Sequence, residues 1–387
     1  MTPRERFLET LTFGTPDRIP FMPGEPREST LRVWHAQGMP EGCGYLELVR
    51  EQVNDRRITR GLAPADFQPR EHEAGTGVSF VMCPTFEEKV LEHKDGHYTV
   101  QDWMGAVTEI SDEFDYTYLR APRDFVTRKW HSFPVQSRAD WEERMKWRFD
   151  PKDPRRFPSD FKERCARLRE RDFPLTVGFN GPFWQLREFT GFEGLCVLLL
   201  EQPEFVRELI SFWREFCSEV LQVLFDHVVP DIIVLSEDMA FKEHPMISPE
   251  MTEEFCGPCY RQWSEQSQAA GVRLFSIDSD GRIDSLIPVW MRCGVNCVEP
   301  VEVAAGNDIV AMRATFGKGM AYRGGVDKRA MAAGGAVLDA ELARIRPVAE
   351  DGGYIPGCDH GVPSDVSWAN YQDYTMKLAE ITGWLRS

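Results

Sequence analysis

The chain has 387 residues, of which 42% are hydrophobic and 28% charged, so it can bury a large core and global disorder is excluded. Its formal net charge of −17 repels nucleic acid and anionic membranes, which excludes both as general partners. No stretch approaches the roughly 18 apolar residues of a membrane-spanning helix, and the start lacks a signal-peptide pattern. We therefore expect a soluble, cytoplasmic protein, and a homodimer stands beside the monomer as an alternative.

The first part of the chain predicts an irregular extension. Thr2 suits the cap of an opening amphipathic helix. Asp95-Gly96 is typical of a type I′ turn and predicts a hairpin. The predicted elements, in chain order, are a helix at 3–13, a helix at 45–62, hairpin strands at 86–93 and 97–100, a strand at 106–110, and helices within the charged, proline-interrupted stretch 131–172.

From about residue 173 the pattern becomes regular. Short apolar segments alternate with amphipathic helices, which predicts βαβ units and a parallel sheet. The predicted strands are 175–179, 232–235, 273–277, 297–301, 320–322 and 354–356, and the longer predicted helices are 202–228, 249–270 and 337–350.

Each of these six strands is followed by polar, mostly ionisable residues. The strand ends of a (β/α)8 barrel converge on one face, where its active site lies, whereas an open doubly wound sheet gathers them at one crevice. The pattern favours an α/β fold of the (β/α)8 TIM-like barrel type with an N-terminal helical and β-hairpin extension. We expect one domain over 1–387, with the extension and first barrel elements in 1–172 and regular barrel units in 173–387.

The segment Asp278-Ser279-Asp280-Gly281 places two carboxylates after a predicted strand. Together with Glu302 and Cys358, they form a candidate metal site, because metals need deprotonated donors from separate segments. The alternative is a plain turn, since Asp280-Gly281 is also good turn chemistry.

The segment 357–361 combines a thiol, a carboxylate and an imidazole. Burying such groups costs free energy, so their presence together favours a functional role. Asp359 and His360 are candidates for proton transfer, together with Asp278 and Asp280. The pair Glu237-Asp238 follows a predicted strand and is a candidate general base or a carboxylate that supports the reacting groups. The alternatives are a surface loop for residues 357–361 and a helix-capping or solvent-facing role for Glu237.

A substrate-binding set is also predicted. In the segment Arg323-Gly324-Gly325-Val326-Asp327, an arginine and backbone N–H groups are suited to a carboxylate or phosphate. The alternative is that Arg323 pairs with Asp327 or with another acid of the barrel mouth. The remaining predicted substrate-binding residues are Asn180, Trp184 and Tyr354.

The motif Cys256-Gly257-Pro258-Cys259 has the letters of a thioredoxin-type redox site. That chemistry expects a strand feeding the motif at a helix N-terminus. Here the motif lies inside a predicted helix that begins at Ser248, so we reject the redox interpretation.

Several segments resemble the uroporphyrinogen decarboxylase superfamily, and the resemblance covers nearly the whole chain. It implies a distorted (β/α)8 barrel. The segments that carry it are Arg4-Glu5-Arg6-Phe7, Asp17-Arg18-Ile19-Pro20, Ser248-Pro249-Glu250, Gly324-Gly325-Val326-Asp327, and Gly352-Gly353-Tyr354-Ile355 through His360 with Pro363, Val366 and Asn370.

The resemblance implies one of two chemistries. True decarboxylases carry an arginine-rich "MRQAGR" motif and an aspartate in an "FSDI"-like segment. The matching stretches here, 22–29 and 78–82, hold only Arg27 and no acid, respectively. Corrinoid-linked methyltransferases of the superfamily bind zinc through His-x-Cys and a later Cys. Those positions are Asp278-Ser279-Asp280 and Cys358 here, and oxygen donors shift the preference from zinc towards magnesium or manganese.

Three hypotheses follow. The first is a methyltransferase or demethylase acting on a small molecule, with a divalent metal and a corrinoid carried on a partner protein. The second is a decarboxylase of a porphyrinogen-like or smaller carboxylated substrate. The third is a non-catalytic binder of a tetrapyrrole or corrinoid. The ionisable groups at the strand ends favour an enzyme over a binder.

Overall fold

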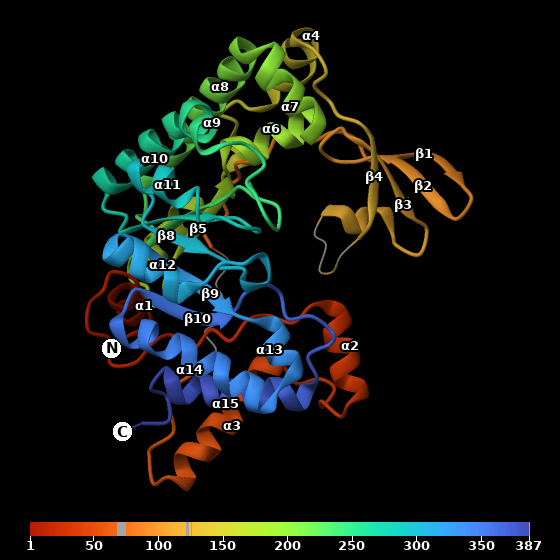
Figure 1. Ribbon diagram of the computed structural model, residues 1–387. Coiled ribbons are helices and arrows are strands. Elements are labelled where there is room, and N and C mark those ends of the chain that lie inside the picture. Colours follow the sequence, from red (N-terminus) through yellow and green to blue (C-terminus); the bar gives the residue numbers. More distant parts are fainter. Residues whose placement is uncertain (68–74, 121–123, 125, 387) are drawn as a thin grey trace.

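The computed structural model describes residues 1–67, 75–120, 124 and 126–386 (Figure 1). In these residues an antiparallel four-stranded sheet has the order β1-β2-β3-β4, and a parallel six-stranded sheet has the order β5-β6-β7-β8-β9-β10. The strands are β1 Lys89–Lys94, β2 His97–Gln101, β3 Val107–Ser111, β4 Arg128–Ser132, β5 Thr176–Asn180, β6 Ile232–Ser236, β7 Leu274–Asp278, β8 Cys297–Glu299, β9 Ala321–Val326 and β10 Tyr354–Cys358.

Most connections between the parallel strands are helical. The helices are α1 Pro3–Leu11, α2 Glu28–Ala36, α3 Tyr45–Thr59, α4 Arg138–Asp140, α5 Phe161–Arg169, α6 Pro182–Thr190, α7 Phe192–Glu201, α8 Pro203–Phe225, α9 Pro249–Met251, α10 Gly257–Ala270, α11 Ile287–Arg292, α12 Ile309–Phe316, α13 Lys328–Ala333, α14 Gly335–Asp351 and α15 Trp368–Ile381. Short 3-10 turns lie at Tyr116–Arg120, Lys146–Arg148, Pro154–Arg156, Val303–Ala305 and Gly317–Gly319, and π-helical turns lie at Trp141–Met145 and Thr252–Cys256.

The predicted hairpin is confirmed. Strands β1 and β2 pair antiparallel around Asp95 and Gly96, whose φ angles of 51° and 76° are both positive, as a type I′ turn requires. The helical prediction for 131–172 is wrong at its start, because β4 extends to Ser132. This strand lies at the edge of its sheet and is largely exposed and basic, so it lacks the apolar alternation that marks a strand.

The six parallel strands lie side by side in chain order, which is the arrangement of an α/β barrel wall. An extended segment continues the wall at the β10 edge. Beside β10, the N–H of Val362 donates to the carbonyl of Glu25 at 2.8 Å, and Pro26 bridges Val362 in parallel. At the β5 edge, the ring of Phe80 stacks on Phe179 with centroids 4.4 Å apart.

Helices pack outside the strands, and the β1–β4 sheet stands to one side of the barrel, opposite α10 and α11 (Figure 1). A single large core cluster of buried side chains extends from Phe7 to Leu385. In the described residues, no helix has the length and apolarity needed to cross a membrane.

Candidate active site

The register of the sheet brings polar residues from neighbouring strands to one level. Asn180 pairs with Ser236, Ser236 with Asp278, and Asp278 with Glu299. Side chains at paired positions of parallel strands share a face. The alternate residue Phe179 packs outward on Trp263 of α10, so this row faces the barrel interior.

Arg323 of β9 completes the row, because its guanidinium lies 2.5 Å from Glu299. We call Asn180, Ser236, Asp278, Glu299 and Arg323 the polar belt. An interior filled by branched apolar side chains is usual in this architecture. A polar level of this kind is therefore a candidate for chemistry rather than for packing.

Asp278 is an acid of the belt with a strongly perturbed proton affinity. Burial, assisted by the charges of Glu299, Asp238 and Asp280, raises the pKa of Asp278 to about 8. Arg323 opposes this shift but does not cancel it. Asp278 is therefore a neutral carboxylic acid near pH 7, which can donate a proton.

His360 is bonded to Asp280, which follows Asp278 by two residues. Its Nε2 lies 3.1 Å from Oδ2 of Asp280, and their side chains are 28% and 39% exposed, so solvent reaches both. The hydrogen bond to Asp280 raises the pKa of His360. The guanidinium of Arg27 and the N–H of Gly361 both donate to Nδ1, at 3.2 and 2.7 Å. In the neutral ring, this arrangement selects the tautomer that carries its proton on Nε2 and donates it to Asp280.

Asp238 joins this pair to α6. Its φ of 43° is in the left-handed region, which is costly for a residue other than glycine and is often found at functional sites. In this conformation its Oδ1 accepts the N–H of Asp280 at 3.1 Å, and its carbonyl accepts NH1 of Arg187 at 2.8 Å. Burial, together with the charge of Asp280, raises the pKa of Asp238.

Glu302 and Asp359 belong to an ion cluster with Lys328, and Glu302 also accepts the N–H of Gly281, next to Asp280, at 3.0 Å. Lys328 Nζ lies 3.1 Å from Glu302 and 3.8 Å from Asp359, and the N–H of Val303 donates to Asp359 at 2.9 Å. Burial raises the pKa of Asp359 to about 6. This cluster joins β9, β10 and the loop after β8, so its position indicates a structural role.

The four predicted metal ligands do not converge. Cys358 is the last residue of β10 and packs against Gly24, and burial raises the pKa of its thiol to about 12. Glu302 is neutralised by Lys328. Across the part of the chain that the structure describes, no three His, Cys, Asp or Glu side chains are placed to hold a metal. The residues present therefore do not fit the zinc site that the resemblance implies.

Glu237 lies behind the belt and is fully buried. Its carboxylate accepts the hydroxyl of Tyr260 and the backbone N–H of Trp184, the latter at 2.9 Å, so it holds the first turn of α6. Burial raises the pKa of Glu237 to about 8. This geometry favours the capping alternative over the general base.

The predicted substrate-binding residues divide into two groups. Asn180 donates to Gln185 at 3.1 Å, and Trp184 donates through its indole to Glu188 at 2.8 Å, both at the β5–α6 junction of the mouth. Arg323 pairs with Glu299, as its alternative interpretation stated. Asp327 caps α13, and buried Tyr354 donates to the carbonyl of Gly324 on the helix-facing side.

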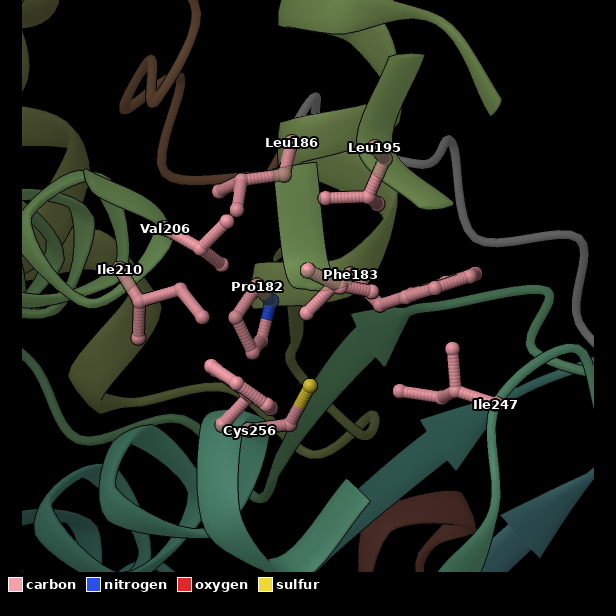
Figure 2. A pocket seen from close by; sticks show the side chains of 10 residues that line it. Pro182, Phe183, Leu186, Leu195, Val206, Ile210, Ile247 and Cys256 are labelled. Atoms are coloured by element: carbon pink, nitrogen blue, oxygen red, sulfur yellow. The ribbon is translucent and has the colours of Figure 1, made fainter. Parts of the chain in front are cut away.

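The Cys-x-x-Cys motif is packed inside the helical layer. Burial raises the pKa of both Cys256 and Cys259 well above the usual range, so the thiols stay protonated. Figure 2 shows Cys256 beside a small apolar cavity between α6, α7 and α8. Its volume is about 10 Å³, which leaves room for one water molecule at most, and its lining is apolar.

Sequence reasoning did not select Lys328, Arg187 or Arg27 as site residues, and it considered Asp238 only together with Glu237, as a general base or a supporting carboxylate. Asp238 follows Glu237 directly, so the pattern of ionisable residues after a predicted strand marks both of them. Lys328 follows a selected aspartate, and Arg27 lies in the segment compared with the decarboxylase motif. Arg187 lies within a helix, where nothing in the pattern distinguishes it from a surface arginine.

These observations define an α/β barrel with an acidic, histidine-containing mouth. A family model described as "Uroporphyrinogen decarboxylase (URO-D)" matches residues 134–378, which is more than half of the chain. The chain therefore belongs to the uroporphyrinogen decarboxylase (URO-D) family. No curated protein matches it in sequence.

Two solved structures are similar to this chain. A methyltransferase from Methanosarcina mazei shares 11% identity with a TM-score of 0.53, over 98% of this chain and 99% of that chain. A B12-independent methionine synthase from Shewanella sp. W3-18-1, in complex with selenomethionine, shares 14% identity with a TM-score of 0.36, over 58% of this chain and 66% of that chain. The first likeness concerns the fold alone and, with the family, confirms the expected barrel.

Proposed function

We propose that this protein is a methyltransferase or demethylase that acts on a small molecule at the polar belt. The observation that carries the proposal is Asp278, an acid with a pKa of about 8 beside the Asp280–His360 hydrogen bond. Membership of the URO-D family and a whole-chain fold likeness to a methyltransferase support it.

The chemistry assigned to Asp278 is protonation of the leaving atom. When a methyl group passes from an oxygen, nitrogen or sulfur atom to a nucleophile, the electrons of the broken bond stay on that atom. Asp278 donates its proton there, and the resulting carboxylate is reprotonated from solvent by way of Asp280 and His360. A positioned general acid of this kind contributes roughly 10²- to 10⁴-fold. The proposed methyl acceptor is a corrinoid carried on a partner protein.

Decarboxylation is the second candidate, because a neutral Asp278 could also protonate a carbanion after loss of carbon dioxide. A porphyrinogen fits poorly as its substrate. Its several carboxylates need several cations, and segment 22–29 supplies only Arg27, which contacts His360. A smaller acid remains compatible with the site.

The experiment is a spectroscopic assay with free cobalamin as the probe. Cob(I)alamin is mixed with the protein and a panel of O-, N- and S-methylated small molecules, and methylcobalamin formation is followed by absorbance. We expect turnover with at least one donor and a loss of about 100-fold or more in Asp278→Asn. No transfer to cob(I)alamin, and none from methylcobalamin to thiols or phenols, would refute the proposal. Carbon dioxide release from a carboxylate panel would favour the decarboxylase instead.

A further inference from the structure

Arg187 reaches the barrel mouth from α6. It lies in the last turn of that helix, and its guanidinium stacks back over the rings of Trp184 and Phe183, 4.8 and 5.7 Å from their centroids. This direction, towards the helix N-terminus, is the usual one for long helical side chains. It brings the guanidinium to the carbonyl of Asp238, at the carboxyl end of β6.

Within the described residues, the hydrogen bonds of Arg187 engage only NH1, which leaves three of its five N–H donors without a protein acceptor. NH1 donates to Asp238 O at 2.8 Å and contacts Sδ of Met246 at 3.9 Å. Within the described part of the chain, Nε and NH2 have no hydrogen-bond acceptor, and the guanidinium forms no ion pair. Burial lowers the pKa of Arg187, although Asp238 and Glu237 oppose this. A partly buried cation without an ion-pair partner is costly, and a ligand anion would offset that cost.

The surroundings of Arg187 determine which anion fits. Nε and NH2 form one side of the guanidinium fork, whose geometry matches the two oxygens of a carboxylate. The acids that act on Arg187 are Asp238, Glu237 and Glu188, and burial raises the pKa of all three, which weakens their negative charge. A doubly charged phosphate would meet about twice the repulsion from Asp238 and Asp280 that a carboxylate meets.

We propose that Arg187 is the anchor for a carboxylate group of the substrate. The anchor is joined to the polar belt through Asp238, whose carbonyl holds Arg187 and whose side chain holds the backbone of Asp280. A small carboxylic acid held there would lie near the carboxyl ends of β6 and β7, the second of which is Asp278. This inference rests on the proposed function for the place of the chemistry, and it narrows the substrate class to small carboxylates.

The test measures binding without turnover, using matched pairs of probes. Formate, acetate and benzoate are compared with formamide, acetamide and benzamide by isothermal titration calorimetry. We expect at least one carboxylate to bind the wild-type protein about tenfold more tightly than its amide. We expect Arg187→Met to abolish this preference and Arg187→Lys, which keeps the charge but not the fork, to retain part of it.

Arg148 offers a matched control. It stacks over Trp147 at 4.5 Å and donates to the carbonyl of Pro84 at 2.8 Å, but it belongs to the extension side of the molecule. Arg148→Met should keep the carboxylate preference. The anchor is refuted by equal binding of acid and amide to the wild type, or by a preference that survives in Arg187→Met. Inorganic phosphate that binds more tightly than every carboxylate, and depends on Arg187, would overturn the choice of anion.

The two proposals fail separately. If no methyl transfer is found but the preference for carboxylates depends on Arg187, the anchor proposal is supported and the proposed methyltransferase function is refuted. If methyl transfer is found but the protein shows no preference for carboxylates, only the anchor proposal is refuted. If Arg187→Met does not fold, the preference for carboxylates over amides is measured in Arg187→Lys instead, where it should be reduced.

Discussion

His360 Nε2 lies 3.1 Å from Asp280 Oδ2, so the loop after the last strand of the barrel is bonded to the loop after β7. We expect Asp280→Asn to lower the pKa of His360, because this hydrogen bond is the largest cause that raises it. The pKa is measured by NMR titration of the imidazole nitrogens. The stabilisation from a raised histidine pKa is fully present below about pH 6.5 and is lost as pH rises through the folded value. The cost of Asp280→Asn to stability should therefore be larger at acidic than at alkaline pH, and an unchanged His360 pKa would contradict the assignment.

The proton on Asp278 should control activity with a definite sign. Its pKa of about 8 means that the acid is present below that pH and lost above it, so activity should fall as pH rises through about 8. The pH dependence of kcat is the measurement. A rate that rises through the same range would assign Asp278 as a base.

Asp278 should also make the fold less stable at alkaline pH. Its folded pKa lies above the unfolded value, so the native state binds more protons and stability falls as pH rises from about 4 to about 8. Asp278→Asn removes the ionisation and should stabilise the protein at about pH 9 by roughly 1–3 kcal/mol. Urea unfolding near pH 5 and near pH 9 checks this, with little difference expected at the lower pH.

Metal content tests the site that the resemblance implies. Because the four predicted ligands do not converge, we expect protein purified without chelators to carry well below one equivalent of any divalent metal. Plasma emission spectrometry of the wild type and Asp280→Ala gives the answer. Near-stoichiometric metal that is lost in Asp280→Ala would show that the ligands rearrange around an ion, and it would restore metal-assisted methyl transfer.

Lys328 should be important for stability. Its removal in Lys328→Met leaves Glu302 and Asp359 without their cation, which should cost about 3–5 kcal/mol by urea unfolding. Adding Glu302→Gln should recover part of this loss. Lys377→Met removes the more exposed partner of Asp339 and Asp373 and should cost about 1 kcal/mol or less. Equal costs for the two lysines would contradict the role assigned to the cluster.

The sequence predicts the wall of the barrel well, because its strands are short apolar runs between helices. The ends of the strands are harder to predict, and they determine which side chains lie in the site. The sequence predicts that the last strand ends at Pro356, so that Cys358 lies in a loop at the mouth of the barrel. The strand continues to Cys358, and because side chains alternate with a period of two, its thiol lies on the same side as Tyr354, towards the helices.

The sequence also does not predict which side chains of the site lie next to one another. Glu302 is predicted as a metal ligand and Asp359 as a proton-transfer group, but Lys328 neutralises both from another strand end. Asp278 ends β7 and Asp280 follows it, their catalytic and metal-binding roles stay predictions, and only the register shows Glu299 beside Asp278. Such pairings depend on the stagger between strands, which local pattern does not encode.

The register that builds the polar belt has an evolutionary consequence. Each strand from β5 to β9 contributes one residue to that level, and the main chain of the wall does not depend on which residue it is. Single substitutions can therefore exchange an amide, a hydroxyl or a carboxyl without rebuilding the barrel. An insertion of one residue within a strand would instead turn its contribution outward. New chemistries should arise in this lineage by point replacement around the ring, with strand lengths preserved.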